Sequence, residues 1–450
     1  MHVVIVGAGE IGFYLAEILA AEDHDIVVVE QNPGRAEEVS ERLDVQVVVG
    51  SGSHPNVLRK ARIAKADFVA AVTENDEVNL LASLVAEQNG VANTVIRLQN
   101  PAFRGLAAEQ LRARVGANLV IDPDQDTADE ILELVHATGT DEVYRMGGDL
   151  VVIGAVVREG AAVANQSLAD IGRSLGVELE FLFGAISRGG TTVIPRGDQR
   201  ILPGDHVRVL CRDSYKKRML EQLGVPGALA RRVMVLGGGA IGTRLATQLQ
   251  DEGAEVVLVE RDMHRAAELA AELDRVVVIG GDVTDTDLLA EEAIGRMDAV
   301  VAATGEDASN VLACAFAASE GASFTVAVLH RLALLPLVSR FGVDAALSPR
   351  TASANAVLRH IRGNTSTVAT FLESDAEVDE IEVSAGSLAD GAVVSELEMP
   401  KDVLLGAVIR SAGKSEIVRG HTVLAAGDSI VLFTRPQSLA DARSLFTGES

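Results

Sequence analysis

Short apolar runs alternate with amphipathic stretches near the start of the chain. The runs Ile26–Val29, Val45–Val49 and Phe68–Val72 have the length and β-branched content of buried strands. The stretches Ile11–Ala21 and Arg35–Leu43 place apolar residues at the spacing of a helix that buries one face. Strands that alternate with helices in this way predict βαβ units, in which helices cover both faces of a parallel sheet.

The same pattern returns in the second half of the chain. The glycine-rich segment GAGEIG follows the first apolar run and recurs as GGGAIG 230 positions later. Gly7, Gly9, Gly12 and Glu30 repeat at this offset as Gly237, Gly239, Gly242 and Glu260. In the segments TENDEVNLLA and TGEDASNVLA, Thr73, Asp76 and Asn79 recur as Thr304, Asp307 and Asn310. Because the offset changes by only one residue between these matches, we infer duplication of a whole module.

Each half continues into a β-rich segment. The residues from Gly184 onward match those from Gly406 onward, and a PGD turn in the first returns as AGD in the second. Short β-rich runs between Gly, Pro and Asp turns predict small α+β domains. The stretches 125–139 and 351–367 have helical spacing and are expected to connect the two kinds of domain.

The predicted fold class is therefore α/β, with two Rossmann-like doubly wound parallel-sheet domains, each followed by a small α+β C-terminal domain. The expected domain limits are 1–124, 140–226, 231–350 and 368–450.

Charge and hydropathy exclude several classes of protein. With 39 basic and 65 acidic residues, the net charge of −26 would repel a phosphate backbone, so we expect no nucleic-acid partner. Charge-free runs such as Ser309–Ser319 span 11 residues, short of the roughly 20 that cross a bilayer, so we expect no transmembrane segment. The apolar run Val3–Val6 follows His2 directly and leaves no room for a signal peptide, which predicts a cytoplasmic protein.

Cysteine and histidine add little chemistry. Cys211 and Cys314 lie far apart in apolar surroundings, which favours two core residues over a disulfide. The nine histidines show no ligand spacing, so no metal site is predicted. His206, in the segment PGDHVRVL, is interpreted as a surface residue.

The glycine-rich segments predict nucleotide sites. In GxGxxG the first glycine permits the tight turn, the second lets the backbone approach a pyrophosphate, and the third lets helix and strand pack closely. Glu30 ends the second predicted strand, where a carboxylate accepts hydrogen bonds from ribose hydroxyls and repels a 2′-phosphate. This favours NAD(H) over NADP(H). ATP and ADP stay open as ligands, as does the alternative that the glycines serve packing alone.

The two copies differ around this motif. Thr73 and Glu74 follow the fourth predicted strand, at the edge where such sheets bind ligands. Arg97 could pair with a phosphate, but the equivalent position in the second copy is Val328. The second copy also has Arg261 where the first has Gln31, so the two sites need not bind the same ligand.

Neither half has an evident catalytic centre. Residues 140–226 offer a dehydrogenase only His206 as a histidine proton donor, and no GxxxxGK[ST] segment occurs. We therefore predict a protein that is not an enzyme. A soluble NAD-dependent oxidoreductase and a small-molecule sensor with anion-binding C-terminal domains remain the alternatives.

The order of these segments resembles the TrkA family. GxGxxG, VVVE, GSGSHPNVLRKA, TENDEVNLLA, IRLQNP and a domain with LPGDHVRVL, all repeated, are similar to the tandem RCK (KTN) domains of NAD-binding regulatory components of Trk potassium uptake systems. The resemblance covers essentially the whole chain. It implies a homo-oligomer, dimer or tetramer, that docks peripherally on the inner face of the cell membrane and gates K⁺ flux through a TrkH-like membrane subunit in response to nucleotides.

The resemblance also implies which residues bind the nucleotides. The first site would comprise Gly7, Ala8, Gly9, Glu10, Ile11, Gly12, Glu30, Thr73, Glu74 and Arg97. The second would comprise Gly237, Gly238, Gly239, Ala240, Ile241, Gly242, Glu260 and Asp282. Asp282 lies in a GDAT-like segment that the family often has, whereas the first half has Ser51 there, so a role for this position is expected in the second site only.

Overall fold

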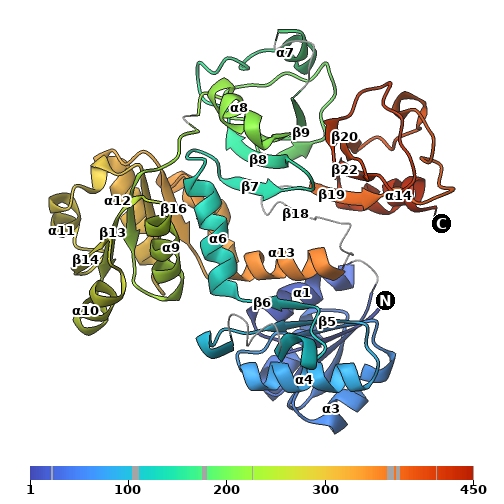
Figure 1. Ribbon diagram of the computed structural model, residues 1–450, viewed down its shortest axis with the longest axis horizontal. Coiled ribbons are helices and arrows are strands. Elements are labelled where there is room, and N and C mark those ends of the chain that lie inside the picture. Colours follow the sequence, from blue (N-terminus) through green and yellow to red (C-terminus); the bar gives the residue numbers. More distant parts are fainter. Residues whose placement is uncertain are drawn as a thin grey trace. The chain divides into compact units, whose positions relative to one another are not determined.

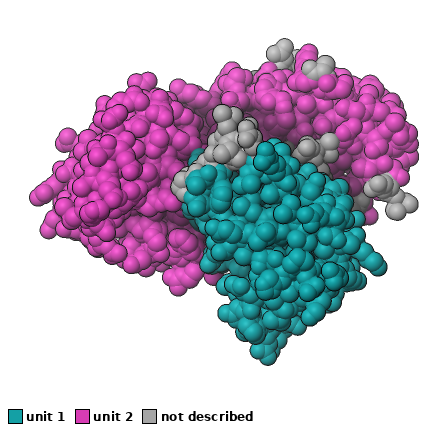
Figure 2. Space-filling view, turned by 60° about the horizontal axis from the view of Figure 1, so that its bottom comes forward, with its two compact units in different colours: residues 1–127, 348–363 teal, residues 128–347, 364–450 magenta. Residues whose placement is uncertain are grey.

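The computed structural model describes residues 1–21, 24–103, 111–174, 180–225, 227–361, 369–370, 376–411 and 413–448. Contacts divide the chain into two compact units, coloured separately in Figure 2. The first contains residues 1–127 and 348–363, and the second contains 128–347 and 364–450. Three of the expected domain limits, at 226, 368 and 450, lie outside the described residues.

The first unit contains a six-stranded parallel sheet in the order β3-β2-β1-β4-β5-β6. Its strands are β1 (His2–Val6), β2 (Asp25–Glu30), β3 (Gln46–Val49), β4 (Phe68–Ala71), β5 (Asn93–Arg97) and β6 (Leu119–Ile121). Its helices are α1 (Glu10–Ala21), α2 (Pro33–Arg42), α3 (Pro55–Lys60) and α4 (Asp76–Gln88), with short 3₁₀ turns η1 (Ile63–Lys65) and η2 (Pro101–Phe103).

Strand alternation divides the core of this domain into two layers. Val3 and Ile5 pack toward α1, whereas Val4 and Val6 pack toward Leu58 of α3 on the opposite face. Strands buried on both faces read as continuous apolar runs, which explains why the sequence predicts them well.

The second unit repeats this sheet in the order β14-β13-β12-β15-β16-β17, again with parallel neighbours. Its strands are β12 (Arg232–Leu236), β13 (Glu255–Glu260), β14 (Val276–Gly280), β15 (Ala299–Ala302), β16 (Thr325–Val328) and β17 (Ala345–Leu347). Its helices are α9 (Ala240–Asp251), α10 (Met263–Glu272), α11 (Thr286–Glu291) and α12 (Asp307–Glu320), with η4 (Ile294–Arg296) and η5 (Leu332–Phe341). The predicted fold class, two Rossmann-like doubly wound domains each followed by a small α+β domain, is confirmed.

The two C-terminal domains are antiparallel five-stranded sheets with matching topology. The first has the order β10 (Thr191–Val193), β9 (Phe181–Arg188), β11 (His206–Arg212), β8 (Leu150–Val156) and β7 (Glu142–Arg145), with α7 (Leu168–Ser174), η3 (Asp213–Tyr215) and α8 (Lys216–Gln222). The second has β21 (Ser415–Ile417), β20 (Val403–Ile409), β22 (Ser429–Thr434), β19 (Glu377–Glu382) and β18 (Ala369–Thr370), with η6 (Val394–Glu396) and α14 (Pro436–Thr447).

These two small sheets, both in the second unit, share one apolar core. A Cβ on Gly184 would lie 2.2 Å from the ring of Phe433, and a Cβ on Gly406 would lie 2.8 Å from Leu210. Because Gly184 and Gly406 occupy matching positions on β9 and β20, each sheet leaves room for a large side chain of the other. The repeat therefore extends to the packing of the C-terminal domains.

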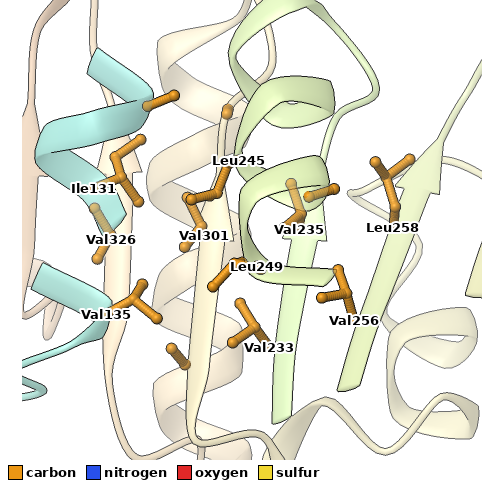
Figure 3. Close-up of a cluster of buried hydrophobic side chains, with 14 of the residues drawn as sticks. Ile131, Val135, Val233, Val235, Leu245, Leu249, Val256, Leu258, Val301 and Val326 are labelled. Carbon is orange, nitrogen blue, oxygen red and sulfur yellow. The ribbon is translucent and has the colours of Figure 1, made fainter. Parts of the chain in front are cut away.

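Two helices exchange between the halves of the chain. The helix α6 (Pro123–Val135) follows β6, yet its Ile131 and Val135 pack in the core of the second nucleotide domain, beside Val301 and Val326 (Figure 3). The helix α13 (Pro349–Ile361) follows β17 but packs against α1 in the first unit (Figure 1). Helices therefore form in both predicted stretches. The helix that follows the first nucleotide domain packs on the second, and the helix that follows the second packs on the first. Residues 362–367 of the second stretch lie outside the described residues.

Two further interpretations from the sequence can be compared with the structure. Both Cys211 and Cys314 are buried free thiols, as predicted, and burial raises the pKa of each to about 12. His206 is not a surface residue, because its side chain is only 14% exposed and its Nε2 lies 2.6 Å from the Asp141 carboxylate. The turn-like sequence around it concealed this pairing with Asp141, the residue directly before β7.

Candidate nucleotide-binding sites

A cavity of about 290 Å³ lies at the carboxyl ends of β1, β2, β3 and β4, at the point where the strand order of the first sheet reverses. It is called the first cavity below. It is lined by Val6, Gly7, Gly9, Val29, Glu30, Gln31, Asn32, Arg35, Gly50, Gly52, Thr73, Glu74, Asn75 and Val78. This reversal is the place where open α/β sheets bind ligands.

The three motif glycines meet different steric demands. Gly7 has φ +99°, and a Cβ there would lie 2.8 Å from Thr73 Cγ2. A Cβ on Gly12 would lie 1.9 Å from the Gly7 carbonyl oxygen, so only glycine lets α1 pack on the loop. A Cβ on Gly9 would meet nothing within 4 Å. Gly9 is thus not required by the fold, and its missing side chain leaves the N-terminus of α1 open to a ligand.

The Glu30 carboxylate is held in place by the backbone. Its Oε2 accepts a 2.7 Å hydrogen bond from Ala8 N–H and its Oε1 accepts a 2.7 Å bond from Asn32 N–H. The residue is 8% exposed. An ionised carboxylate can accept about four hydrogen bonds, so two remain for ribose hydroxyls.

The wall after β4 is fixed by a buried amide. Asn79 Nδ2 donates to the carbonyl oxygens of Thr73 and Arg97, both at 2.9 Å, and its Oδ1 accepts from Thr73 N–H at 3.0 Å. Asn79 therefore ties the loop after β4 to the end of β5. The sequence signalled this residue only by its recurrence as Asn310, with no indication of its role.

A second cavity of about 410 Å³ repeats this arrangement in the second unit. It is lined by Gly237, Gly239, Val259, Glu260, Arg261, Asp282, Val283, Ala303, Thr304, Gly305, Glu306 and Ser309. Glu260 accepts hydrogen bonds from Gly238 N–H at 2.7 Å and Asp262 N–H at 2.8 Å. Gly242 again abuts the carbonyl of Gly237, and Gly239 again faces open space.

The two cavities differ in where charge lies. The first has Glu74 and Asn75 after β4, where the second has Gly305 and Glu306 after β15. The second also has Asp282 after β14, where the first is lined by Gly50 and Gly52. Hydrogen bonds from the backbone and side chain of Thr284 lower the pKa of Asp282, so this carboxylate is an acceptor.

The cations also differ between the cavities. Arg35 on α2 lines the first, whereas Arg261 at the end of β13 lines the second. In the second domain, Arg265, which stands at the position of Arg35, pairs instead with Glu268 at 3.1 Å.

Several expected site residues do not line either cavity. Arg97 lies outside the first cavity and donates to Gln99 at 2.7 Å, and burial lowers its pKa despite the carboxylates around it. The other expected residues that line neither cavity are Ala8, Glu10, Ile11, Gly12, Gly238, Ala240, Ile241 and Gly242.

A further cluster lies outside both cavities. Ligand atoms of Asp141, Glu142 and His206 lie within 4.8 Å of one another, which spacing along the sequence did not suggest. Arg208, which is fully buried, donates two hydrogen bonds to Glu142, at 2.8 and 3.0 Å. Both carboxylates are thus already engaged in ion pairs. Among the described residues, no helix has the length and hydropathy needed to cross a membrane.

Comparisons with known proteins identify the domains. The TrkA-N domain model matches residues 3–123 and 233–349, and the TrkA-C domain model matches residues 378–447. Solved structures share the fold at low sequence identity. The GsuK channel bound to NAD has a TM-score of 0.63 and 19% identity, over 100% of this chain and 79% of that one. The GsuK RCK domain has a TM-score of 0.61 and 19% identity, over 98% of this chain and 95% of that one.

Curated relatives match over nearly their full length. A Trk system potassium uptake protein TrkA homolog of Archaeoglobus fulgidus is 33% identical over 99% of this chain and 100% of its own. The Trk system potassium uptake protein TrkA of Halomonas elongata is 33% identical over 99% of this chain and 98% of its own. That of Azorhizobium caulinodans is 31% identical, with the same shares of the two chains covered. Since both the domain models and these relatives span the chain, it belongs to the TrkA family of Trk system potassium uptake proteins.

Proposed function

We propose that this chain is a nucleotide-responsive regulatory subunit that binds NAD(H) and gates K⁺ flux through a TrkH-like membrane subunit. The observation that carries the proposal is the Glu30 carboxylate, fixed by Ala8 N–H and Asn32 N–H at a cavity that also contains Gly9. A carboxylate held beside an open helix N-terminus suits a ribose with free hydroxyls attached to phosphates. The family assignment supports the link to potassium uptake.

ATP and ADP are the second candidate ligands for the same cavities. They present the same ribose and phosphates, and a solved GsuK structure with a TM-score of 0.51 is described as bound to ADP. Arg35 and Arg261 supply positive charge at the two cavities, which suits additional phosphates. Because the charged groups differ between the cavities, we propose that the two sites rank NADH, NAD⁺, ATP and ADP differently.

Regulation follows if nucleotide binding favours one of two conformations. A ligand shifts such an equilibrium only by its differential affinity for the two states, and the membrane subunit must then change nucleotide affinity by the same factor. The exchanged helices α6 and α13 provide a physical route, because each packs on one nucleotide domain and continues from the other. We further propose a homo-oligomer that acts from the cytoplasmic face of the membrane.

Equilibrium binding and co-purification test this proposal. The full chain should bind NADH and ADP with a stoichiometry above one per chain, and Glu30→Arg should remove one of the sites. A tagged chain should co-purify with a K⁺-translocating membrane subunit from detergent extracts of its own cells. Substrate-dependent NADH turnover by the purified chain would instead support an oxidoreductase.

A further inference from the structure

An arginine from the second half of the chain reaches the glycine-rich loop of the first nucleotide domain. Arg350, in the first turn of α13, forms an ion pair between its Nη2 and Oε1 of Glu10. Glu10 directly follows Gly9 and begins α1. The two residues lie 340 positions apart in sequence but in the same compact unit.

Packing of α13 fixes where this guanidinium lies. Ala354, Val357 and Leu358 of α13 are buried in the core that contains α1. Ser353 Oγ donates a 2.9 Å hydrogen bond to Asp126 at the start of α6. The first turn of α13, and Arg350 with it, is therefore held beside the N-terminus of α1 by a packed helix.

The Arg350 side chain is a partly desolvated cation. It is 24% exposed, and its Nε is buried with no hydrogen-bond partner among the described residues. Burial lowers its pKa, although an arginine stays protonated under ordinary conditions. Because Nε is buried, only the exposed part of the guanidinium can reach a ligand, and a guanidinium beside a helix N-terminus is suited to phosphate oxygens.

Glu10 presents the opposite charge at the same place. Its carboxylate is favourable to the dipole of α1 but would repel a pyrophosphate that approaches Gly9. Arg350 removes this conflict, because the pair is neutral and leaves guanidinium donors for phosphate oxygens.

The second nucleotide domain has neither member of the pair. Ala240 occupies the position that Glu10 has in the first domain. The helices α6 and α13 align through Pro123 and Pro349, and α6 then has Asp124 at the position of Arg350. The carboxylate and the arginine thus occur together in the first domain and are absent together from the second. This is expected if the carboxylate positions the arginine.

We propose that Arg350 is part of the first nucleotide site, where it binds the phosphates of the ligand while Glu10 positions its guanidinium. The inference rests on the proposed function and adds to it a residue delivered by the second half of the chain. Phosphate binding at the first site then acts directly on α13, and hence on the segment that joins the second nucleotide domain to its C-terminal domain.

The test compares ligands with and without phosphate. The experiment uses full-length protein with Gly239→Ala, whose added methyl group contacts no protein atom within 4 Å but obstructs ligand binding at the second site. This protein is titrated with NAD⁺, ADP and adenosine by calorimetry or competition. Adding Arg350→Ala should weaken NAD⁺ and ADP about tenfold or more and leave adenosine unchanged, with the loss shrinking at high salt. Arg350→Lys, which keeps the charge but not the forked donors of the guanidinium, should lose less NAD⁺ and ADP affinity than Arg350→Ala.

The outcomes separate the inference from the function on which it rests. Equal NAD⁺ affinity with and without Arg350→Ala would overturn the inference alone. An equal loss for adenosine and ADP would also overturn it, because that pattern indicates loosened packing of α13. If the Gly239→Ala parent binds none of the three ligands, the proposed function fails and the inference fails with it.

Discussion

The Glu30 carboxylate accepts a 2.7 Å hydrogen bond from the backbone N–H of Ala8, in the middle of the glycine-rich loop. The same relationship joins Glu260 to Gly238 at 2.7 Å in the second domain. The residue expected to bind ribose therefore also hydrogen-bonds to the loop expected to bind phosphate, which links the two parts of the proposed nucleotide site.

Replacing this carboxylate should weaken nucleotide binding without abolishing the fold. In Glu30→Gln, an amide must turn one N–H₂ group toward a backbone N–H, so one of the two bonds is lost. We expect NAD⁺ affinity at the first site to fall by about 1.5–3 kcal/mol, roughly 10- to 100-fold. Calorimetry in the Gly239→Ala background measures this. Glu260→Gln is the matched control and should leave the first site unaffected.

An added methyl group should lower stability at Gly12 but lower nucleotide affinity at Gly9. Gly12→Ala places a Cβ 1.9 Å from the Gly7 carbonyl and should lower the thermal unfolding midpoint by several degrees. Gly9→Ala meets no atom within 4 Å, so it should keep the wild-type midpoint and lose nucleotide affinity. Comparable destabilisation by the two substitutions would contradict the distinct roles assigned to these glycines.

Removing the Asn79 side chain should lower the unfolding free energy of the first domain. It is fully buried, and Asn79→Ala leaves the Thr73 and Arg97 carbonyls without their donor. We expect a loss of about 2–4 kcal/mol in the unfolding free energy of the first domain. Hydrogen exchange of β4 and β5 reports it locally. Leu81→Ala, at a 46% exposed position of the same helix, is the control and should change exchange little.

The His206–Asp141 pair should make stability depend on pH. Burial alone would lower the pKa of His206, but the nearby Asp141 carboxylate outweighs it and raises that pKa above 6.5. Burial would likewise raise the pKa of Asp141, but the charge and hydrogen bond of His206 lower it below 3.8. The histidine contribution is complete below its unfolded pKa and is lost as pH rises through its folded pKa. The aspartate contribution is lost as pH falls through its own folded pKa.

The stabilisation by this pair should thus be greatest between about pH 4 and about pH 6.5 and decline on either side. Unfolding midpoints of the wild type and His206→Gln across this range measure it. His264→Gln, at a side chain that is 86% exposed, serves as control. A difference between wild type and His206→Gln that is independent of pH would rule out the pair as its source.

Much of the fold could be predicted because its determinants are local. Parallel strands buried on both faces appear as apolar runs such as Ile26–Val29, and the repeat offset revealed the second domain from the first. The glycine positions and Glu30 were identifiable for the same reason, since each motif residue lies within one βαβ unit.

The remaining features depend on contacts that no local pattern encodes. The helical spacing of α6 and α13 predicted helices but not which domain each would cover, because an apolar stripe fits either core. The pairing of Glu10 with Arg350 follows from that exchange. Likewise, the sequence around His206 gave no sign that Asp141, directly before β7, would lie within 2.6 Å of it.

Nucleotide-dependent K⁺ flux is the most direct test of the central claim. The chain and its membrane subunit are reconstituted in vesicles, and flux is measured against NADH, NAD⁺, ATP and ADP for the wild type and for Gly9→Ala/Gly239→Ala. The account predicts that at least one nucleotide changes wild-type flux severalfold and that the double variant, still folded and still bound to the membrane subunit, loses this response. A nucleotide response of equal size in the double variant would contradict it.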